Sequence, residues 1–186
     1  MNIQVQFYIC SRDRIEDAEK TILSQGKQFA DKYGFRIPHK IIRTANAKPC
    51  FADSELFFSV SHSGSYWACA VSNAELGIDL QRYQSCRMEL IAKRFYHPKE
   101  AAWLNGKGQE AFFLVWTAKE SYVKFTGEGI TDDFAAFSVV DDNGNIDACN
   151  RVFFQHIPFS EDYSLCICTP GRAVAEIVYE TDKKFF

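Results

Sequence analysis

The stretches GIDLQ, residues 77–81, and WTAKESYVK, residues 116–124, decide the fold class expected of this chain. The first is typical of a β-strand, in which Asp79 and Gln81 project from the same face because they are two residues apart. The second is typical of a helix, which we expect to end before Gly127 because glycine readily takes the left-handed conformation beyond a helix end. A strand and a helix that both carry polar groups predict an α+β protein with a functional site.

Strand and helix patterns recur along the whole chain. The first half predicts strands at residues 3–9, 40–44, 56–61 and 67–72, a helix ending near Gly34, and a loop through Lys48 and Pro49. The second half predicts strands at residues 76–82, 134–140, 151–156, 163–168 and 174–179, and helices at residues 88–94, from residue 97, and at 109–125. We therefore expect an N-terminal α+β half, residues 1–75, and a C-terminal α+β half, residues 76–186, which carries most of the metal-binding and catalytic residues.

Composition excludes several classes of protein. The 186 residues are 47% apolar and 15% aromatic, enough to build a sizeable core. A formal net charge of −3 and a pI near 5.8 argue against a general nucleic-acid binder. No segment approaches the roughly 18 apolar residues of a membrane span, and the opening MNIQVQFYIC does not have the pattern of a signal peptide. Seven cysteines without C-x-x-C spacing favour free thiols, so we expect a cytoplasmic protein that does not contact a membrane.

Asp79 is the strongest single candidate for a site residue. It lies between Ile78 and Leu80, with Gly77 ahead, although aspartate is disfavoured inside strands. Such a local conflict often marks a functional position. The alternative is a solvent-facing residue on an edge strand, or a turn-forming residue at a strand end.

Glu120 and Lys124 lie four residues apart and share one helix face. As a solvated surface pair they would contribute only about 0.3–0.5 kcal/mol. Against this alternative, Glu120 shares its face with Trp116 and Val123, an apolar neighbourhood in which a solvated pair is less expected. These two groups, with Asp79 and the amide of Gln81, could converge on a metal-bound ligand that carries phosphate.

Two further stretches could contact phosphate. His62 lies among hydroxyls in FSVSHSG, residues 58–64, and phosphate oxygens accept from imidazolium, hydroxyl and backbone N–H groups alike. It could equally be a turn or strand-end histidine. Lys48, before Pro49, could contact a phosphate or a purine edge, or lie in an ordinary loop. The chain has no phosphate-binding P-loop, dinucleotide-binding glycine motif or G-x-S-x-G elbow, which excludes the common nucleotide hydrolases, dinucleotide enzymes and serine hydrolases.

Taken in order, five motifs resemble the 4′-phosphopantetheinyl transferases of the surfactin-synthetase type. They are KP at residues 48–49, FSVSHSG, GIDLQ, KRFYHPKEAAWL at residues 93–104, and WTAKESYVK. The resemblance implies a pseudo-twofold pair of similar α+β halves, with the active site in the cleft between them, in a protein that works as a monomer. It also implies a Mg²⁺-dependent reaction, in which the phosphopantetheine arm of coenzyme A moves to a serine of an acyl or peptidyl carrier protein and 3′,5′-ADP is released.

The chemistry of that reaction suits the candidate residues. A serine hydroxyl must attack a negatively charged pyrophosphate, so a hard cation is needed, and magnesium accepts two carboxylates together with waters and phosphate oxygens. Asp79 and Glu120, with Gln81, would hold the metal, and a site rich in oxygen also accepts Mn²⁺. Glu120, or a water that it orients, would accept the serine proton. Lys124 would neutralise the pyrophosphate.

The resemblance also assigns coenzyme A contacts to this chain, namely Lys48, Pro49, Ser61, His62, Lys119 and Lys124. Among them, His62 would bind a phosphate of the coenzyme, most naturally the 3′-phosphate, with Ser61 beside it. Lys48 would lie near the nucleotide. The segment of residues 82–95 would meet the carrier protein, and its apolar candidates are Tyr83, Met88 and Ile91.

Two departures from the family pattern matter. Many relatives carry an acidic residue where this chain has Gln81, so we expect weaker metal binding without loss of activity. The segment ahead of Lys48 is short, and Arg12 or Arg14 matches the arginine of longer relatives only loosely, so we expect reduced affinity for coenzyme A or reduced discrimination of its 3′-phosphate. One alternative is a catalytically degenerate module that binds coenzyme A or a carrier protein. Another is an unrelated α+β interaction domain, which would require the five motifs to be coincidental.

Overall fold

The chain forms two compact units in the computed structural model, which describes residues 2–129, 132–149 and 151–179. One unit consists of Met1–Glu75 together with the chain from Ala173, and the other of Leu76–Arg172. Both units combine sheets with helices, so the α+β class expected from the sequence is confirmed.

The last strand belongs to the N-terminal unit. Strand β10 (Ala173–Tyr179) pairs in parallel with β1 (Ile3–Ser11) along its whole length. A strand joins the sheet that supplies partners for its backbone N–H and C=O groups. The sequence analysis assigned these residues to the C-terminal half, and the structure corrects that assignment, because the pairing joins opposite ends of the chain.

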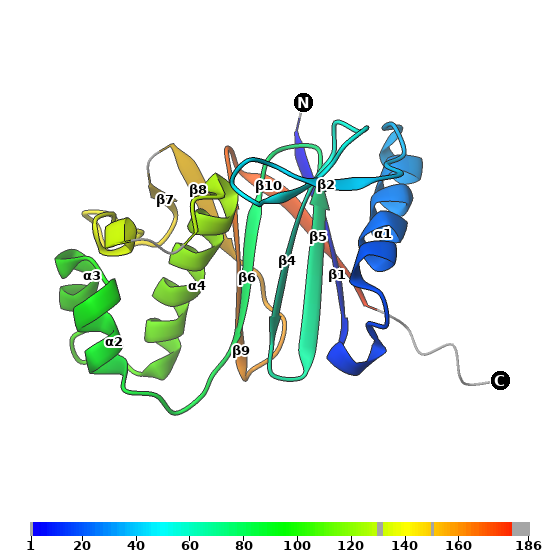
Figure 1. Ribbon diagram of the computed structural model, residues 1–186. Coiled ribbons are helices and arrows are strands. Elements are labelled where there is room, and N and C mark those ends of the chain that lie inside the picture. The colour runs from blue at the N-terminus through cyan, green and yellow to red at the C-terminus, as the bar shows by residue number, and fades with distance from the viewer. Residues whose placement is uncertain (1, 130–131, 150, 180–186) are drawn as a thin grey trace. The chain divides into compact units, whose positions relative to one another are not determined.

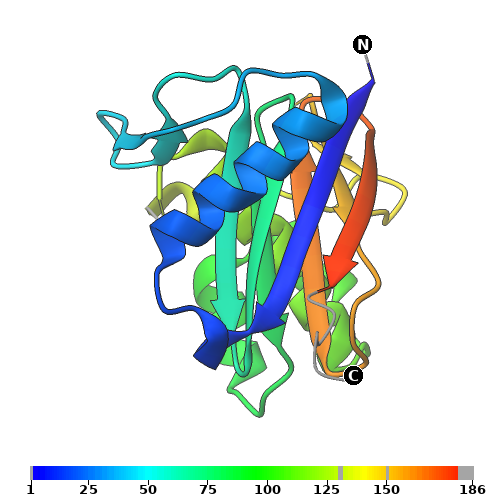
Figure 2. The same ribbon diagram turned by 90° about the vertical axis from the view of Figure 1, so that its right-hand side faces the viewer.

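The N-terminal unit is a four-stranded sheet with a helix on one face. Strand order is β10-β1-β5-β4, and β4 (Phe57–Ser63) and β5 (Tyr66–Ser72) form an antiparallel hairpin. Helix α1 (Ala18–Tyr33), which follows the short helix η1 (Arg12–Arg14), crosses this sheet in Figure 2. A separate hairpin consists of β2 (Ile41–Arg43) and β3 (Pro49–Phe51). Pro49 was expected in a loop, and it instead begins β3, where its partner is Arg43.

Helix α1 has caps that its local sequence explains. The carboxylate of Asp17 accepts a hydrogen bond from the backbone N–H of Lys20 at 3.0 Å. Gly34 ends the helix in the left-handed conformation, with φ of 77°. Between the caps, Ile22 and Phe29 are buried in a cluster that includes Trp67 of β5. These contacts attach the helix to the sheet.

The C-terminal unit is a second four-stranded sheet packed against a long helix. Its strands, in the order β6-β9-β8-β7, are β6 (Gly77–Arg82), β9 (Tyr163–Thr169), β8 (Val152–His156) and β7 (Ala148–Cys149). Its helices are α2 (Met88–Phe95), α3 (Pro98–Trp103), α4 (Gln109–Thr126) and the short η2 (Asp132–Ala135). Helix α4 lies alongside β6 and β9 (Figure 1). This helix and β6 contain the two stretches that the sequence singled out.

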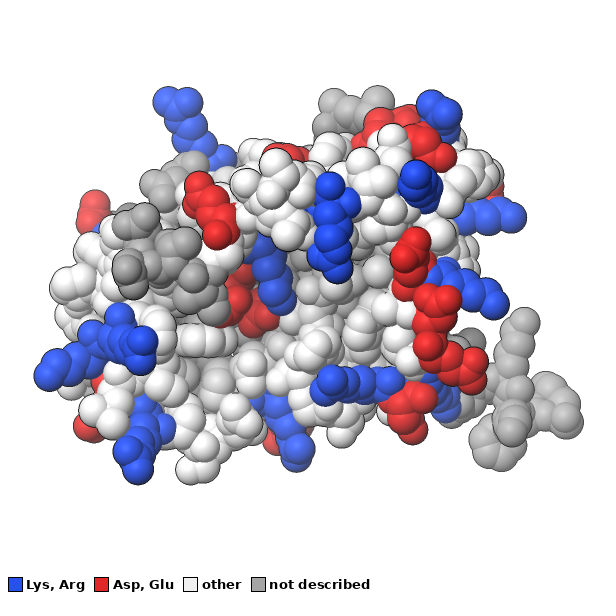
Figure 3. All heavy atoms as spheres, viewed as in Figure 1, with Lys and Arg blue, Asp and Glu red and all other residues white. Residues whose placement is uncertain are grey.

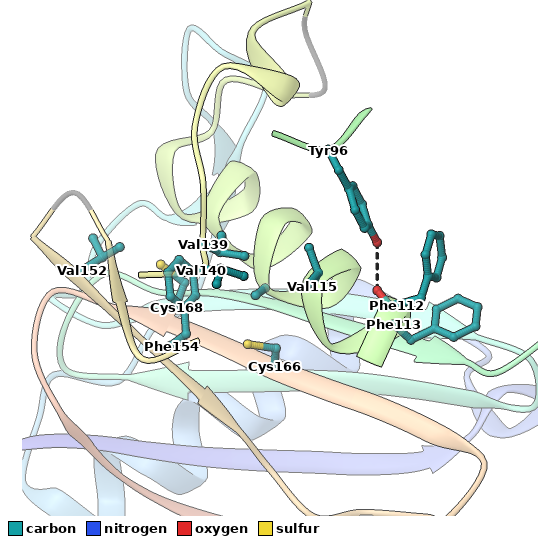
Figure 4. Close-up of a cluster of buried hydrophobic side chains, with 11 residues drawn as sticks. Tyr96, Phe112, Phe113, Val115, Val139, Val140, Val152, Phe154, Cys166 and Cys168 are labelled. Carbon is teal, nitrogen blue, oxygen red and sulfur yellow. Dashed lines mark hydrogen bonds between the residues drawn. The ribbon is translucent and has the colours of Figure 1, made fainter. Parts of the chain in front are cut away.

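The core of the C-terminal unit is rich in aromatic rings, as Figure 4 shows. Tyr96 stacks on Phe112 with ring centroids 5.2 Å apart, and its buried hydroxyl donates to the carbonyl of Phe112 at 2.8 Å. Val115 of α4 and Cys166 of β9 belong to the same cluster and have no exposed surface. A core of this kind holds α4 firmly against the sheet.

Residues 134–140, expected to form a strand, do not form one. Helix η2 occupies the first part of this stretch, and irregular chain follows. Two buried side chains take the backbone groups that a strand would need: Glu100 accepts from the N–H of Val139 at 2.7 Å, and Lys119 donates to the carbonyl of Phe137 at 2.7 Å. Side chains, and not a neighbouring strand, therefore provide the hydrogen-bond partners of these backbone groups.

Charged side chains of both signs are interspersed over the face of the molecule drawn in Figure 3. This mixture agrees with the small formal net charge of −3. Within the described part of the chain, no helix has the length and apolar character needed to cross a membrane.

Candidate functional site

Asp79 lies on a strand whose partners are buried. It is opposite Cys166 in the β6–β9 ladder, and only 6% of its surface is exposed. Its Oδ1 accepts a hydrogen bond from Nζ of Lys124 at 2.7 Å. Asp79 is therefore a buried carboxylate paired with a cation from α4, and the alternative of a solvent-facing strand residue does not describe it.

Gly77 explains how β6 comes so close to α4. A Cβ atom at this position would lie 2.0 Å from the carbonyl oxygen of Ser121 and 2.3 Å from the backbone nitrogen of Phe125. The strand therefore packs directly on the helix backbone, where only glycine fits. Asp79, two residues further along the strand, comes within reach of the side chains on the last turns of α4.

Buried polar side chains hold α4 on β9. The hydroxyls of Thr117 and Ser164 lie 2.8 Å apart, and the hydroxyl of Thr117 also donates to the carbonyl of Phe113 at 2.9 Å. One turn later, the hydroxyl of Ser121 lies 3.7 Å from Sγ of Cys166. These contacts fix the rotation of α4 about its own axis.

Glu120 lies in a setting that favours its protonated form. Its pKa rises from the ordinary value of 4.5 to about 7, first because of burial and then because of the negative charge of Asp79, while Lys124 opposes the rise. Trp116, one turn earlier on the same face, packs edge-on against Phe95. The structure thus brings together Asp79, Glu120 and Lys124, and a carboxyl group with this pKa can give or take a proton near neutral pH.

Gln81 is on β6 as expected, and its amide is turned toward the main chain. Its Nε2 donates to the carbonyl of Arg82 at 3.1 Å. The side chain is partly buried and carries no charge. Three residues were expected to hold a metal. Among them, Asp79 and Glu120 interact electrostatically with each other.

The carboxylates of Asp79 and Glu120 suit a hard divalent cation. Magnesium takes oxygen ligands and usually keeps several waters, so two protein carboxylates with phosphate oxygens suffice. Burial and then repulsion by Asp79 raise the pKa of Glu120, and the repulsion is the kind of interaction that a bound cation relieves. In the described ranges of the chain, no group of three or more His, Cys, Asp or Glu side chains is arranged as a metal site. Any ion here would therefore depend on ligands from water or substrate as well.

Lys119, which was expected to contact coenzyme A, is inside the protein. Its side chain and that of Glu100 are both 0% exposed, and Nζ lies 3.1 Å from Oε2 of Glu100. The ammonium also lies 4.0 Å from the centroid of the Phe137 ring. Burial lowers the pKa of Lys119, and the negative charge of Glu100 opposes this effect. In this structure, Lys119 therefore joins parts of the core and does not present its charge to a ligand.

Glu100 is the buried partner that sequence reasoning missed. Its Oε2 accepts from the backbone N–H of His97 at 2.8 Å, while Nδ1 of His97 accepts from the N–H of Lys99 at 3.2 Å. The two form a capping box at the start of α3, with Pro98 in the first turn. The order His-Pro-x-Glu was a local signal for this cap. It did not reveal that the same carboxylate would also pair with Lys119.

The remaining predicted residues lie in the N-terminal unit. Ser61 is buried on β4, and His62, the next residue, is exposed. Lys48 precedes β3 and is partly buried, and its carbonyl accepts from the N–H of Thr44 at 2.9 Å. These residues form two separate groups, one on a strand of the four-stranded sheet and one on the β2–β3 hairpin. Their roles toward coenzyme A stay predictions.

The segment expected to meet a carrier protein includes helix α2. No residue of this helix is fully buried, and 59% of the surface of Leu90 is exposed. Tyr83, Met88 and Ile91 are partly buried and pack against the core of the unit. Their role in docking also stays a prediction.

Comparison with known proteins places this geometry in a family. The model of the 4′-phosphopantetheinyl transferase superfamily matches residues 75–168. The 4′-phosphopantetheinyl transferase gsp of Aneurinibacillus migulanus is 36% identical over 126 residues, which are 62% of this chain and 52% of the relative. A 4′-phosphopantetheinyl transferase of Bacillus subtilis is 32% identical over 124 residues, 61% of this chain and 55% of the relative. The 4′-phosphopantetheinyl transferase psf-1 of Bacillus pumilus is 30% identical over 179 residues, 87% of this chain and 76% of the relative.

The matches to gsp and to the Bacillus subtilis protein span about half the length of those relatives, whereas the match to psf-1 extends over most of both chains. The segment matched by the family model contains Asp79, Glu120 and Lys124. It also contains the buried pair of Lys119 and Glu100. The chain belongs to the 4′-phosphopantetheinyl transferase superfamily.

Proposed function

We propose that this protein transfers the 4′-phosphopantetheine arm of coenzyme A to a serine of an acyl or peptidyl carrier protein, and that 3′,5′-ADP is released. The observation that carries the proposal is the cluster of Asp79, Glu120 and Lys124 at the contact of β6 and α4. Two mutually repelling carboxylates and an ammonium, in a chain of this family, have the composition that a pyrophosphate substrate and a divalent cation require.

Each residue of the cluster has a distinct task in the proposed reaction. Asp79 and Glu120 would hold Mg²⁺, or Mn²⁺, which when bound supplies positive charge for the pyrophosphate. The serine Oγ forms a bond to the β-phosphorus of coenzyme A, and the bond from that phosphorus to 3′,5′-ADP breaks. Glu120, or a water that it orients, takes the proton from the serine hydroxyl. Lys124 offsets charge on the departing phosphate.

Further elements of the proposal come from the sequence. Lys48, Pro49, Ser61 and His62 are proposed coenzyme A contacts of the N-terminal unit. The segment of residues 82–95 is the proposed contact for the carrier protein. A cytoplasmic location and a monomeric state remain predictions of the sequence and of its family resemblance.

A second candidate function is a module that binds coenzyme A or a carrier protein without turnover. Gln81 favours this candidate, because it supplies an uncharged amide whose nitrogen is turned toward Arg82. Against it, a pure binding protein has no need of a carboxyl group whose pKa lies near neutrality beside a second carboxylate.

Intact-mass spectrometry separates the two candidates. An apo carrier protein is incubated with coenzyme A, Mg²⁺ and either the protein or its Glu120→Gln variant. Glu19→Gln, on the exposed first turn of α1, serves as the control for loss of one negative charge. We expect the carrier to gain the mass of one phosphopantetheine arm with the wild type and the control, and not with Glu120→Gln. Coenzyme A binding without any mass gain on several carriers would support the binding module.

A further inference from the structure

The ammonium of Lys124 pairs with a carboxylate oxygen of Asp79. Nζ of Lys124 is 2.7 Å from Oδ1 of Asp79, and the exposed fractions of the two side chains are 31% and 9%. The lysine is thus the more accessible partner of a nearly buried carboxylate. It reaches Asp79 from the last turn of α4, where a positive charge is favoured by the helix dipole.

We propose that Lys124 competes with a divalent cation for Asp79, and that binding of the cation displaces the ammonium from this carboxylate. The displaced ammonium is then free to meet the phosphate groups of the donor. The competition itself does not depend on the transferase activity, and only the second step rests on the proposed function.

Charge balance in the cluster supports displacement. Gln81 is neutral, so the carboxylates of Asp79 and Glu120 together balance one divalent ion, and Lys124 would be an excess positive charge beside it. Magnesium binds oxygen at about 2.0–2.1 Å, so an ion on Asp79 and an ammonium in its present place would be close neighbours of like charge. A negative residue at position 81 could have accommodated both cations, and this chain has none there.

The geometry of α4 permits the movement. The helix backbone is fixed by the close contact at Gly77 and by the pair of Thr117 and Ser164. The side chain of Lys124 is flexible and partly exposed, so it can leave Asp79 by rotation about its own bonds. Displacement therefore needs no change in the fold, and Glu120 keeps its place one turn earlier.

Mn²⁺ uptake tests the competition in the absence of coenzyme A and of any carrier. Electron paramagnetic resonance measures the free ion during titration of the wild type, Lys124→Met and Lys124→Arg. We expect Lys124→Met to bind Mn²⁺ about tenfold more tightly than the wild type, because a like charge next to the ion is removed. Lys124→Arg keeps the charge and should bind as weakly as the wild type. Lys107→Met, which removes an exposed lysine ahead of α4, controls for the change in net charge.

The outcomes separate this inference from the proposed function. Equal uptake by the wild type and Lys124→Met, including no uptake by either, overturns the competition even if the protein proves to be a transferase. Tighter binding by Lys124→Met that is abolished by adding Asp79→Asn supports it, even if no carrier is modified. Circular dichroism of each variant shows whether it is folded, and Lys124→Gln, which also removes the ammonium, replaces Lys124→Met in the titration if that variant is not folded.

Discussion

Helix α4 carries two lysines, five residues apart, that each pair with a carboxylate in very different surroundings. Lys119 and Glu100 are both 0% exposed, and Glu100 is also bound by the backbone of His97 and Val139. Lys124 is 31% exposed and pairs with Asp79 beside a third charged group, Glu120. The first pair has hydrogen-bond partners on several sides, as a structural pair must. The second has an accessible cation and an excess carboxylate, which suits a site that exchanges partners.

The largest effect expected from this comparison is on stability at the buried pair. Lys119→Met leaves the carboxylate of Glu100 in the core without its cation, so we expect the free energy of unfolding to fall by about 3–5 kcal/mol. The double variant Lys119→Met/Glu100→Leu removes both charges and should recover part of this loss. Urea unfolding monitored by circular dichroism measures both. A loss below about 1 kcal/mol for Lys119→Met would show that the two pairs are alike.

A methyl group at Gly77 should disturb the pair of Lys124 and Asp79 and leave the pair of Lys119 and Glu100 intact. Gly77→Ala places a Cβ atom against the backbone of Ser121 and Phe125, so β6 must move away from α4. We expect a loss of about 1–3 kcal/mol in the free energy of unfolding, as in other overpacked contacts. Transfer of phosphopantetheine to an apo carrier, measured by intact mass, should decrease more than the loss of folded protein accounts for. Gly108→Ala, at a glycine with φ of −85° where a Cβ atom meets nothing within 4 Å, is the control for replacing a glycine without overpacking.

Loss of the contact between the hydroxyls of Thr117 and Ser164 should have a smaller effect on the free energy of unfolding. Thr117→Val keeps the shape of the side chain and leaves the hydroxyl of Ser164 without this partner, so we expect a loss of about 1–2 kcal/mol. Adding Ser164→Ala removes the second hydroxyl and should restore much of the stability. If the double variant were as unstable as the sum of the single variants, measured by urea unfolding, the two hydroxyls would not act as a pair.

The smallest expected change in stability accompanies a clear change in titration. Lys124→Met should cost about 1 kcal/mol, because its ammonium is partly solvated. It should also raise the pKa of Glu120, whereas Asp79→Asn should lower it, since Lys124 opposes the rise caused by Asp79 and burial. Carbon-13 NMR of labelled glutamate side chains follows the titration directly. If the pKa of Glu120 were unchanged in both variants, Glu120 would not interact electrostatically with Asp79 or Lys124.

The raised pKa of Glu120 also determines the direction in which folding stability changes with pH. Between pH 4.5 and about 7 the folded protein keeps a proton on Glu120 that the unfolded chain has lost. Folding stability from this group is therefore complete below pH 4.5 and is lost as the pH rises through about 7. Glu120→Gln removes this contribution to the pH dependence of unfolding, which urea titrations at several pH values detect.

The local patterns of the sequence were sufficient to locate β6 and α4. The alternation in GIDLQ and the glycine at position 127 are patterns of neighbours within a few residues, so the strand at 77–82 and the helix at 109–126 follow from them. Asp79 stood out for the same reason, because an aspartate between two apolar strand residues is a local conflict. Local pattern failed at residues 134–140, where Glu100 and Lys119 bind backbone groups of a stretch that was expected to form a strand.

What the sequence by itself determined was the list of chemical groups and the elements that carry them: two carboxylates, an amide and two lysines on a strand and a helix. Only the tertiary structure decided which lysine meets which carboxylate. Lys119 pairs with Glu100, at a sequence separation of 19 residues, and Lys124 pairs with Asp79, at a separation of 45 residues. Strand β10 pairs with β1, which lies near the start of the chain. The physical reason is that periodicity reports only near neighbours, whereas burial and pairing depend on how distant segments pack.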